Sequence, residues 1–128
     1  MMAMQQPPTL HELETEIMDE VWRRGECTVR EVLDVLNTRS DVKRAYTTVM
    51  TVMHRLVGKA LLRRERRGRS DLFVAAISRD EYADARAGAE VDALVNAYGD
   101  VALAHFAREI GRLDPGRREQ IRRLAGSE

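Results

Sequence analysis

A single β-hairpin signal, set between segments of helical spacing, most constrains the fold of this 128-residue chain. Residues 61–66 and 72–77 form two extended runs, and the turn between them contains Gly68 among arginines. Helical spacing resumes at Ser78. Three helical segments precede the hairpin, at residues 10–24, 28–36 and 45–60. This order predicts a mainly α fold with a small β-hairpin, namely a winged helix-turn-helix followed by C-terminal dimerisation helices.

Helix starts and helix breaks divide the chain into parts. Capping boxes are predicted at Thr9 with Glu12, at Thr28 with Glu31 and at Ser78 with Glu81. Further helices are expected at 78–98, at 101–110 and from Asp114-Pro115 onward. We therefore expect a flexible N-terminus at 1–9, a winged-helix DNA-binding domain at 10–77 and a helical dimerisation region at 78–128.

The region from Ser78 onward has too few apolar residues to form a core of its own. Its apolar stripes are expected to pack against a second copy of the chain, and a two-fold dimer suits a palindromic DNA site. The residues predicted to form this contact are Leu94, Val95, Leu103, Phe106, Ile110, Ile121 and Leu124.

Charge is distributed unevenly along a chain whose formal net charge is zero. Ten basic and two acidic residues lie between Arg39 and Ser70, and the segments on either side are acidic. A basic block of this kind indicates a surface that faces a polyanion, although a solvated charged face would show the same composition.

The segment from Ala45 to Lys59 carries the strongest functional pattern. Helical spacing buries Val49, Val52, Met53, Leu56 and Ala60 on one side. The opposite side carries Arg44, Thr47, Thr51, His54, Arg55 and Gly58, with Thr48 and Lys59 on a flank. Threonines offer hydroxyl and methyl groups for reading base edges, whereas a solvent-facing helix with no binding function would more often carry Glu, Lys or Ala.

The turn of the hairpin supplies a second set of cations. Arg66, Arg67 and Arg69 surround Gly68, and a hairpin tip can place arginines on phosphates or in the minor groove. The alternative is a flexible basic turn with no defined partner.

The residues from Ala45 to Leu56, AYTTVMTVMHRL, resemble the AYTTVxTxxxRL signature of the penicillinase-repressor (BlaI/MecI) family. The run Ile17-Met18-Asp19-Glu20-Val21-Trp22 is similar too, and the resemblance extends over nearly the whole chain. It implies a dimeric winged-helix repressor that occupies palindromic double-stranded operator DNA. The complete predicted contact set is Arg44, Tyr46, Thr47, Thr48, Thr51, His54, Arg55, Lys59, Arg67 and Arg69.

The resemblance also implies a mode of induction. In family members a membrane sensor protease system detects β-lactam, and the repressor is cut between Asn and Phe in its dimerisation region. The collinear pair here is His105-Phe106, in which the Phe is kept and His replaces Asn. A copper-responsive branch carries a C-terminal cysteine cluster, whereas this chain has no cysteine after Cys27.

Other features favour structural roles over chemistry. We expect no enzyme activity, cofactor or metal site, because no nucleophile or phosphate loop is visible and the three histidines are far apart. The carboxylates Glu12, Glu14, Glu16, Asp19 and Glu20 are expected on a solvated helix face and not in acid–base chemistry. Cys27 is expected to be a half-buried structural thiol and not an oxidant sensor.

The chain shows no signal peptide and no apolar run long enough for membrane insertion, so a cytoplasmic location is expected. Two alternative functions stay open. The first is a winged-helix module for protein interaction or DNA architecture, and the second is a regulator that senses a small ligand between its C-terminal helices.

Overall fold

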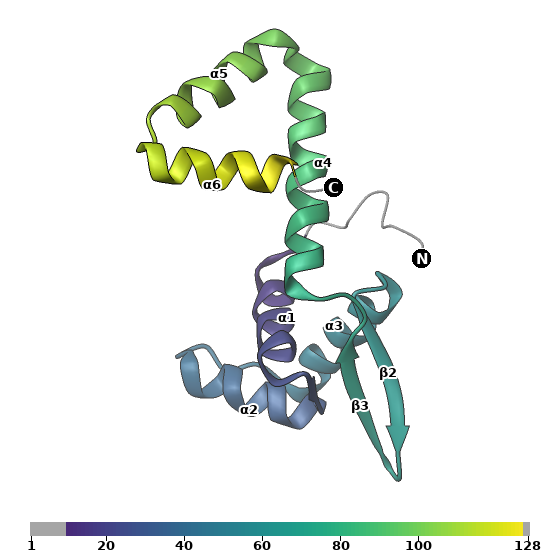
Figure 1. The fold of residues 1–128 in the computed structure, drawn as a ribbon. Coiled ribbons are helices and arrows are strands. Elements are labelled where there is room, and N and C mark those ends of the chain that lie inside the picture. The colour runs from purple at the N-terminus through teal and green to yellow at the C-terminus, as the bar shows by residue number, and fades with distance from the viewer. Residues whose placement is uncertain (1–9, 127–128) are drawn as a thin grey trace. The chain divides into compact units, whose positions relative to one another are not determined.

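A computed structural model describes residues 10–126, and the predicted flexible segment 1–9 lies outside the described residues. The expected mainly α fold with a small hairpin is confirmed (Figure 1). The chain divides into two compact units between Arg86 and Ala87. The elements are α1 (Glu12–Arg24), β1 (Glu26–Cys27), α2 (Val29–Arg39), α3 (Tyr46–Gly58), β2 (Leu62–Arg67), β3 (Ser70–Ala75), α4 (Arg79–Tyr98), α5 (Asp100–Gly111) and α6 (Pro115–Gly126).

The core of the first unit is aliphatic and lies between α1, α2, α3 and the sheet. Each helix contributes one apolar stripe, and Phe73 is the one aromatic side chain fully buried among them. Each such side chain contributes about 1.5–3 kcal/mol when it leaves water. The helical members are Ile17, Met18, Val21, Val29, Val32, Leu33, Leu36, Val49, Val52, Met53 and Leu56.

Helix starts are largely as the capping pattern predicts. The Thr28 hydroxyl accepts a hydrogen bond from the Glu31 backbone N–H at 3.1 Å, and the Glu31 carboxylate accepts one from the Thr28 N–H at 2.8 Å. Ser78 and Glu81 form the same reciprocal pair. The prediction for α1 is wrong, because His11 is the N-cap and Glu14 in place of Glu12 accepts from its backbone N–H at 3.0 Å.

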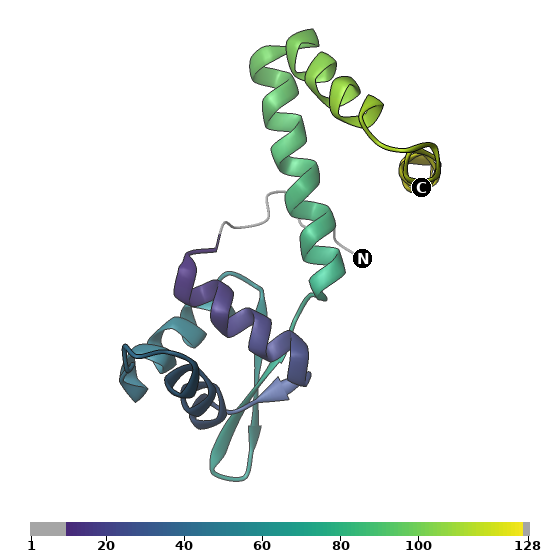
Figure 2. The ribbon, with the colours of Figure 1, turned by 90° about the vertical axis from the view of Figure 1, so that its left-hand side faces the viewer.

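The sheet has three antiparallel strands in the order β1-β3-β2, and β1 was not expected from the sequence. Within the first unit, the β2–β3 ribbon extends away from α1, α2 and α3 (Figures 1 and 2). Its pairing runs to Arg67 and Ser70, so the predicted turn over 66–71 narrows to Gly68-Arg69. Gly68 has φ 60°, and it holds the first turn position, where a type II′ turn requires positive φ.

The end of α3 is a Schellman motif with an alanine in the glycine position. The Leu61 N–H donates to the Leu56 carbonyl at 3.0 Å, and the Ala60 N–H donates to the Val57 carbonyl at 3.0 Å. Ala60 therefore has φ 64°, and it is exposed and outside the helix, so its predicted place on the buried stripe is wrong.

Ala60→Gly is expected to stabilise the protein, because glycine adopts positive φ without a Cβ clash. The greater entropy of glycine in the unfolded chain offsets part of the gain, which leaves a rise of about 0.5–1 kcal/mol in the free energy of unfolding. Urea denaturation measures this change in the free energy of unfolding. Gly58→Ala, inside the helix, is a comparison variant that should also stabilise the protein, through helix propensity and without changing the Schellman motif. A loss of stability in Ala60→Gly would contradict the strained conformation.

The second unit is formed by the rest of α4 with α5 and α6. Gly99, with φ 58°, separates α4 from α5, and the Asp114 carboxylate accepts from the Arg117 N–H at 2.9 Å at the start of α6. Both helix breaks are as predicted. Among the described residues of this unit only Ala102 is buried. Several large apolar side chains are exposed, namely Val91, Leu94, Tyr98, Val101, Leu103, Ile110 and Leu124.

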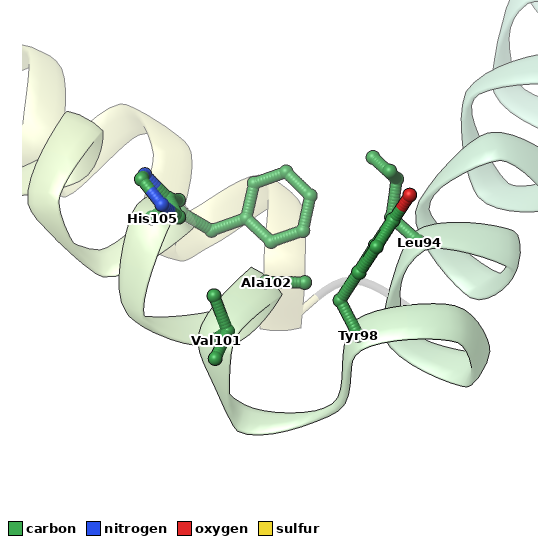
Figure 3. Close-up of a pocket in the computed structure, with 6 residues that line it drawn as sticks. Leu94, Tyr98, Val101, Ala102 and His105 are labelled. Atoms are coloured by element: carbon green, nitrogen blue, oxygen red, sulfur yellow. The ribbon is translucent and has the colours of Figure 1, made fainter.

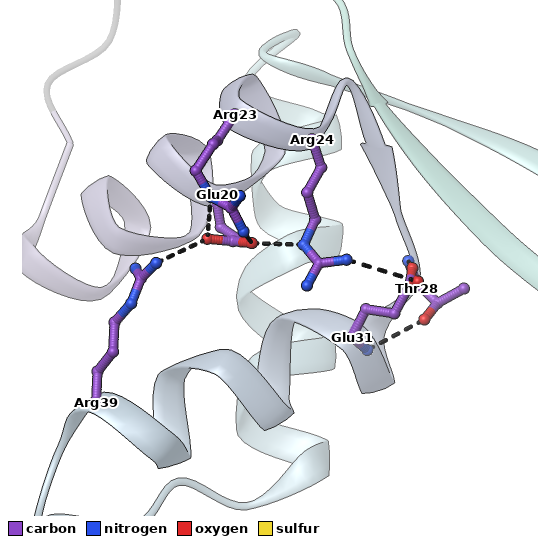
Figure 4. A network of polar contacts seen from close by, with 6 residues as sticks. All are labelled: Glu20, Arg23, Arg24, Thr28, Glu31 and Arg39. Carbon is purple, nitrogen blue, oxygen red and sulfur yellow. Dashed lines mark hydrogen bonds and ion pairs between the residues drawn. The ribbon is translucent and has the colours of Figure 1, made fainter.

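Two carboxylates of α1 are buried, which corrects the expectation of a solvated face. Glu20 lies between α1 and α2 and forms ion pairs with Arg23, Arg24 and Arg39 (Figure 4). Burial raises the pKa of the Glu20 carboxyl, but hydrogen bonds from Arg23 and Arg24 outweigh it and hold that pKa below its usual value. Glu14, the second, is 2% exposed and pairs with Lys59.

Candidate nucleic-acid interface

The outward face of α3 is polar and exposed. Thr47, Thr48, Thr51, His54 and Arg55 are all exposed, whereas Val49, Val52, Met53 and Leu56 behind them are buried. The helix therefore presents short hydroxyl side chains and cations to solvent from a firmly packed base. The predicted division of α3 into a buried stripe and a threonine face is what the structure contains.

A polar groove joins α3 to the start of α2 and to the hairpin. The Arg30 guanidinium lies 5.1 Å from the centre of the Tyr46 ring, and the His54 ring packs edge-on to Phe73 at 5.6 Å. The groove thus brings three predicted contact residues, Tyr46, His54 and Arg69, beside an arginine that the sequence reasoning missed. Its lining is Thr28, Val29, Arg30, Tyr46, Met50, His54, Arg69, Ser70, Asp71 and Phe73.

The cations of this face differ in whether a carboxylate already neutralises them. Within residues 10–126, Arg30, Arg55 and Arg69 form no ion pair, although all three are exposed. Arg44 lies 3.8 Å from Glu16, and Arg67 lies 3.6 Å from Glu26. Such solvent-accessible pairs, half-buried for Arg44 and exposed for Arg67, are worth about 0–1 kcal/mol, so a phosphate can replace the carboxylate at little cost.

Arg30 was not predicted as a DNA contact because it lies in an acidic segment of the sequence, and the negative net charge of that segment outweighs a single cation. The signal that could have found it is its position at the second residue of α2, next to the helix N-terminus. Backbone N–H groups at such a terminus already favour anions.

Lys59 pairs with a buried carboxylate of α1 and does not line the groove. Its Nζ lies 2.7 Å from Oε2 of Glu14, and its side chain is 25% exposed. Burial raises the pKa of the Glu14 carboxyl, but the His11 backbone N–H and the Lys59 ammonium outweigh it and keep that pKa below its usual value. Lys59 therefore neutralises a buried charge.

The loop that leads into α3 is fixed by one amide side chain. Asn37 Oδ1 accepts from the Arg44 N–H at 2.7 Å, and Asn37 Nδ2 donates to the Arg44 carbonyl at 3.1 Å. Both backbone groups of Arg44 are thereby satisfied two residues before α3 begins. Asn37, itself half-buried, positions the entry to α3.

Cys27 is fully buried, more so than the half-buried position expected. Burial raises the pKa of its thiol to about 12, so the thiolate form is negligible at neutral pH. Among residues 10–126 no three acidic, histidine or cysteine side chains gather closely enough to hold a metal ion.

The second unit carries an apolar pocket between the end of α4 and α5 (Figure 3). Leu94 and Tyr98 line it from α4, and Val101, Ala102, His105 and Phe106 line it from α5. The residues predicted for dimerisation lie in the same unit: Leu94, Leu103, Ile110 and Leu124 are exposed, and Val95, Phe106 and Ile121 are half-buried.

A three-helix winged domain with an outward threonine face beside an arginine-bearing hairpin defines the class of winged-helix DNA-binding proteins. The sequence profile described as penicillinase repressor matches residues 10–126, and the chain belongs to this family of transcriptional regulators. No described helix is both long and apolar enough to cross a membrane.

Individual relatives agree with this assignment. The transcriptional regulator BlaI of Mycobacterium tuberculosis H37Rv is 41% identical over 107 residues, which are 80% of this chain and 74% of the relative. The DNA-binding domain of the repressor BlaI superimposes with a TM-score of 0.52 at 25% identity, over 62% of this chain and 94% of that one. The Bacillus licheniformis BlaI monomer in complex with the blaP half-operator superimposes with a TM-score of 0.51 at 25% identity. This match also covers 62% of this chain and 94% of the relative.

Proposed function

We propose that the protein is a dimeric repressor that binds a palindromic operator with α3 of each protomer in a major groove. The observation that carries this proposal is the polar groove, in which Tyr46, Met50 and His54 of α3 come together with the start of α2 and the hairpin turn, beside the exposed threonines of α3. The solved Bacillus licheniformis BlaI, a structural relative, is in complex with a half-operator, which supports operator binding by this chain.

The three threonines are the proposed base readers. Thr47 and Thr51 lie one turn apart on the exposed face of α3, with Thr48 exposed on its flank, and their hydroxyl and methyl groups suit base edges and the thymine methyl. Arg30, Arg55 and Arg69 are the proposed phosphate contacts, joined by Arg44 and Arg67 once their carboxylates are displaced. Lys59 is left out of this set because it pairs with Glu14.

Thr51→Ala is expected to weaken binding to the cognate operator by about 1–3 kcal/mol and to leave binding to random DNA almost unchanged. Fluorescence anisotropy titrations on both DNAs measure the two losses. Thr15→Ala, an exposed threonine on α1, is a matched control that should change neither. Equal losses on cognate and random DNA would contradict base reading by Thr51.

Arg69→Ala is expected to lower affinity for all DNA sequences alike and to reduce the slope of log K against log salt concentration by about 1 per protomer. The reason is that Arg69 has no carboxylate partner in the described chain and is free to displace a counterion from phosphate. Arg112→Ala, on α5, serves as the control. An unchanged salt slope would show that the hairpin turn does not touch phosphate.

Dimerisation is proposed for the helices after Arg86. The exposed apolar side chains of this unit cannot be covered within the unit itself, because only Ala102 among its described residues is buried. A second copy of the same helices supplies an apolar face of matching composition, as expected for an isologous contact.

Induction by proteolysis at His105-Phe106 is proposed as well, under a membrane sensor protease system for β-lactam. The pair lies in the middle of α5, where His105 is exposed and Phe106 is half-buried. A protease needs extended backbone, so cleavage there requires α5 to open first. Loss of the dimer contact would then halve the phosphate contacts on the operator.

Genome-wide mapping of DNA bound by the protein tests the proposed function as a whole. We expect a small set of sites that share one palindrome and lie over promoters. Binding spread evenly over the genome would favour the architectural alternative, and an absence of bound DNA would favour a protein-interaction module.

A further inference from the structure

Helix α3 begins without a side-chain cap, although its first turn carries two of the three proposed base readers. Its N-cap is Ala45, whose methyl group cannot accept a hydrogen bond from the first backbone N–H groups of the helix. The first turn consists of Tyr46, Thr47 and Thr48. A helix end without a capping side chain frays more readily, so the position of these threonines depends on contacts outside the turn.

Asn37, in the last turn of α2, supplies such a contact directly before the turn. Its side-chain amide accepts from the Arg44 N–H at 2.7 Å and donates to the Arg44 carbonyl at 3.1 Å. Two bonds to one residue fix its orientation as well as its position. Arg44 precedes Ala45, whose carbonyl accepts from the N–H groups of Thr48 and Val49 at 3.1 and 3.2 Å. Asn37 therefore holds the residue from which the first turn of α3 starts.

The loop between α2 and α3 is bonded to α2 at further points. The Lys43 ammonium donates to the Asn37 carbonyl and, at 3.2 Å, to the Ser40 carbonyl, as basic side chains do at helix C-termini. The Ser40 hydroxyl accepts from the Val42 N–H at 3.1 Å. Asn37 is thus attached to the loop through both its side chain and its backbone carbonyl. These bonds connect the end of α2 to the start of α3.

We propose that Asn37 replaces the cap that α3 lacks and thereby determines how well the protein distinguishes its operator from other DNA. This inference rests on the proposed function, since it takes Thr47 and Thr48 as base readers. Asn37 is half-buried and is a positioning residue, which acts through Arg44 on the first turn of α3. When that turn opens, the two threonines lose the helical spacing that sets them against base edges.

The loss on opening is selective because the proposed phosphate contacts lie outside the first turn. Arg30 is on α2, Arg55 is in the last turn of α3, and Arg69 is in the hairpin turn. Binding to DNA of any sequence depends on such phosphate contacts, whereas discrimination depends on base contacts. A protein whose first turn is open part of the time therefore loses operator affinity in proportion to the closed fraction and keeps its affinity for other DNA.

The test uses the full chain, with the operator found by genome-wide mapping and a duplex of the same base composition in scrambled order. For Asn37→Ala we expect affinity for the operator to fall about tenfold and affinity for the scrambled duplex to change less than about twofold. Amide hydrogen exchange measures the turn itself. Protection of the Thr48 and Val49 amides should fall about tenfold, with the Met53 amide unchanged.

A rescue variant separates this role from a general effect on folding. Ala45 has φ −82° and ψ 170° or less extended, at 150°, which suits a capping serine, so Ala45→Ser adds the missing acceptor. In Asn37→Ala with Ala45→Ser, operator affinity and Thr48 protection should come within about threefold of Ala45→Ser alone. Failure of this rescue would overturn the proposal that Asn37 acts through the first turn of α3.

Thr38→Ala is the matched control on α2. The Thr38 hydroxyl donates to the Asp34 carbonyl at 2.7 Å, and among the described residues it makes no bond to the loop at 40–45. All measurements should stay as in the wild type, and urea denaturation checks that each variant is folded. Equal binding of both duplexes by the wild type would overturn the proposed function itself. Normal discrimination by the wild type, with the same discrimination in Asn37→Ala, would overturn only the role of Asn37.

Discussion

Leu103→Glu combined with Leu124→Glu is expected to convert the protein to a monomer and to lower its affinity for the full operator about 100- to 10,000-fold. Both leucines are exposed, at 48% and 71%, in a unit with almost no buried residues. A glutamate at either position would be desolvated without a partner in the proposed contact. The intact dimer binds its second half-site at high effective concentration, and the monomer loses that gain entirely.

Sedimentation velocity and titration on the full and half operators measure this result together. Half-site affinity should stay as in the wild type, and the salt slope on the full operator should fall to about half, because one protomer neutralises half the phosphates. Arg108→Gln changes the charge of α5 by the same amount as each substitution and is the control. A variant that remains dimeric would show that these leucines do not form the contact.

Lys59→Met is expected to lower the free energy of unfolding at pH 7 by about 2–4 kcal/mol, because it leaves the Glu14 carboxylate buried without its cation. Lys59 and Glu14 lie 2.7 Å apart, and Glu14 is 2% exposed. Methionine keeps most of the side-chain volume, so the loss reports on charge and not on a cavity. If Lys59 contacted phosphate instead, the main effect would be a weaker salt slope for DNA binding at unchanged stability.

The pH dependence of this loss separates the two roles. In the wild type the pKa of Glu14 is lowered, so its stabilisation is present at neutral pH and is lost as pH falls below about 4.5. In Lys59→Met the pKa of the unpaired carboxyl rises, and the difference between variant and wild type narrows as acid protonates it. Glu14→Gln with Lys59→Met should recover most of the stability. A pH-independent difference would contradict the charge argument.

Hydrophobic periodicity and helix-capping residues were sufficient to predict most of the fold from the sequence. The stripe on α3 from Val49 to Leu56, the cap at Thr28 and the break at Gly99 each depend on residues close in sequence, and all three are where the pattern predicts. Strand β1 could not be predicted this way, because two residues carry no periodicity and pair only once β3 is in place. The narrow hairpin turn was missed because arginines pair across the strands as readily as they form a loop.

The sequence predicted the orientation of those site residues whose exposure depends only on their position in a helix or turn. Thr47, Thr51 and Arg69 face outward for local reasons, so helical spacing and the turn were enough. Lys59, Glu14 and Glu20 depend on a partner from another helix or on burial, and the sequence shows neither. From the sequence alone a charged residue is therefore predicted to face solvent, because the oppositely charged partner that allows its burial is known only from the tertiary structure.

Because its thiol is buried, Cys27 can serve as a natural chemical probe of unfolding. It is the only cysteine in the chain, it has no exposed surface, and its pKa of about 12 keeps it protonated. An alkylating reagent can therefore modify it only in molecules whose winged domain has opened. The rate of labelling measures how often that domain opens, with and without operator DNA, and needs no engineered probe.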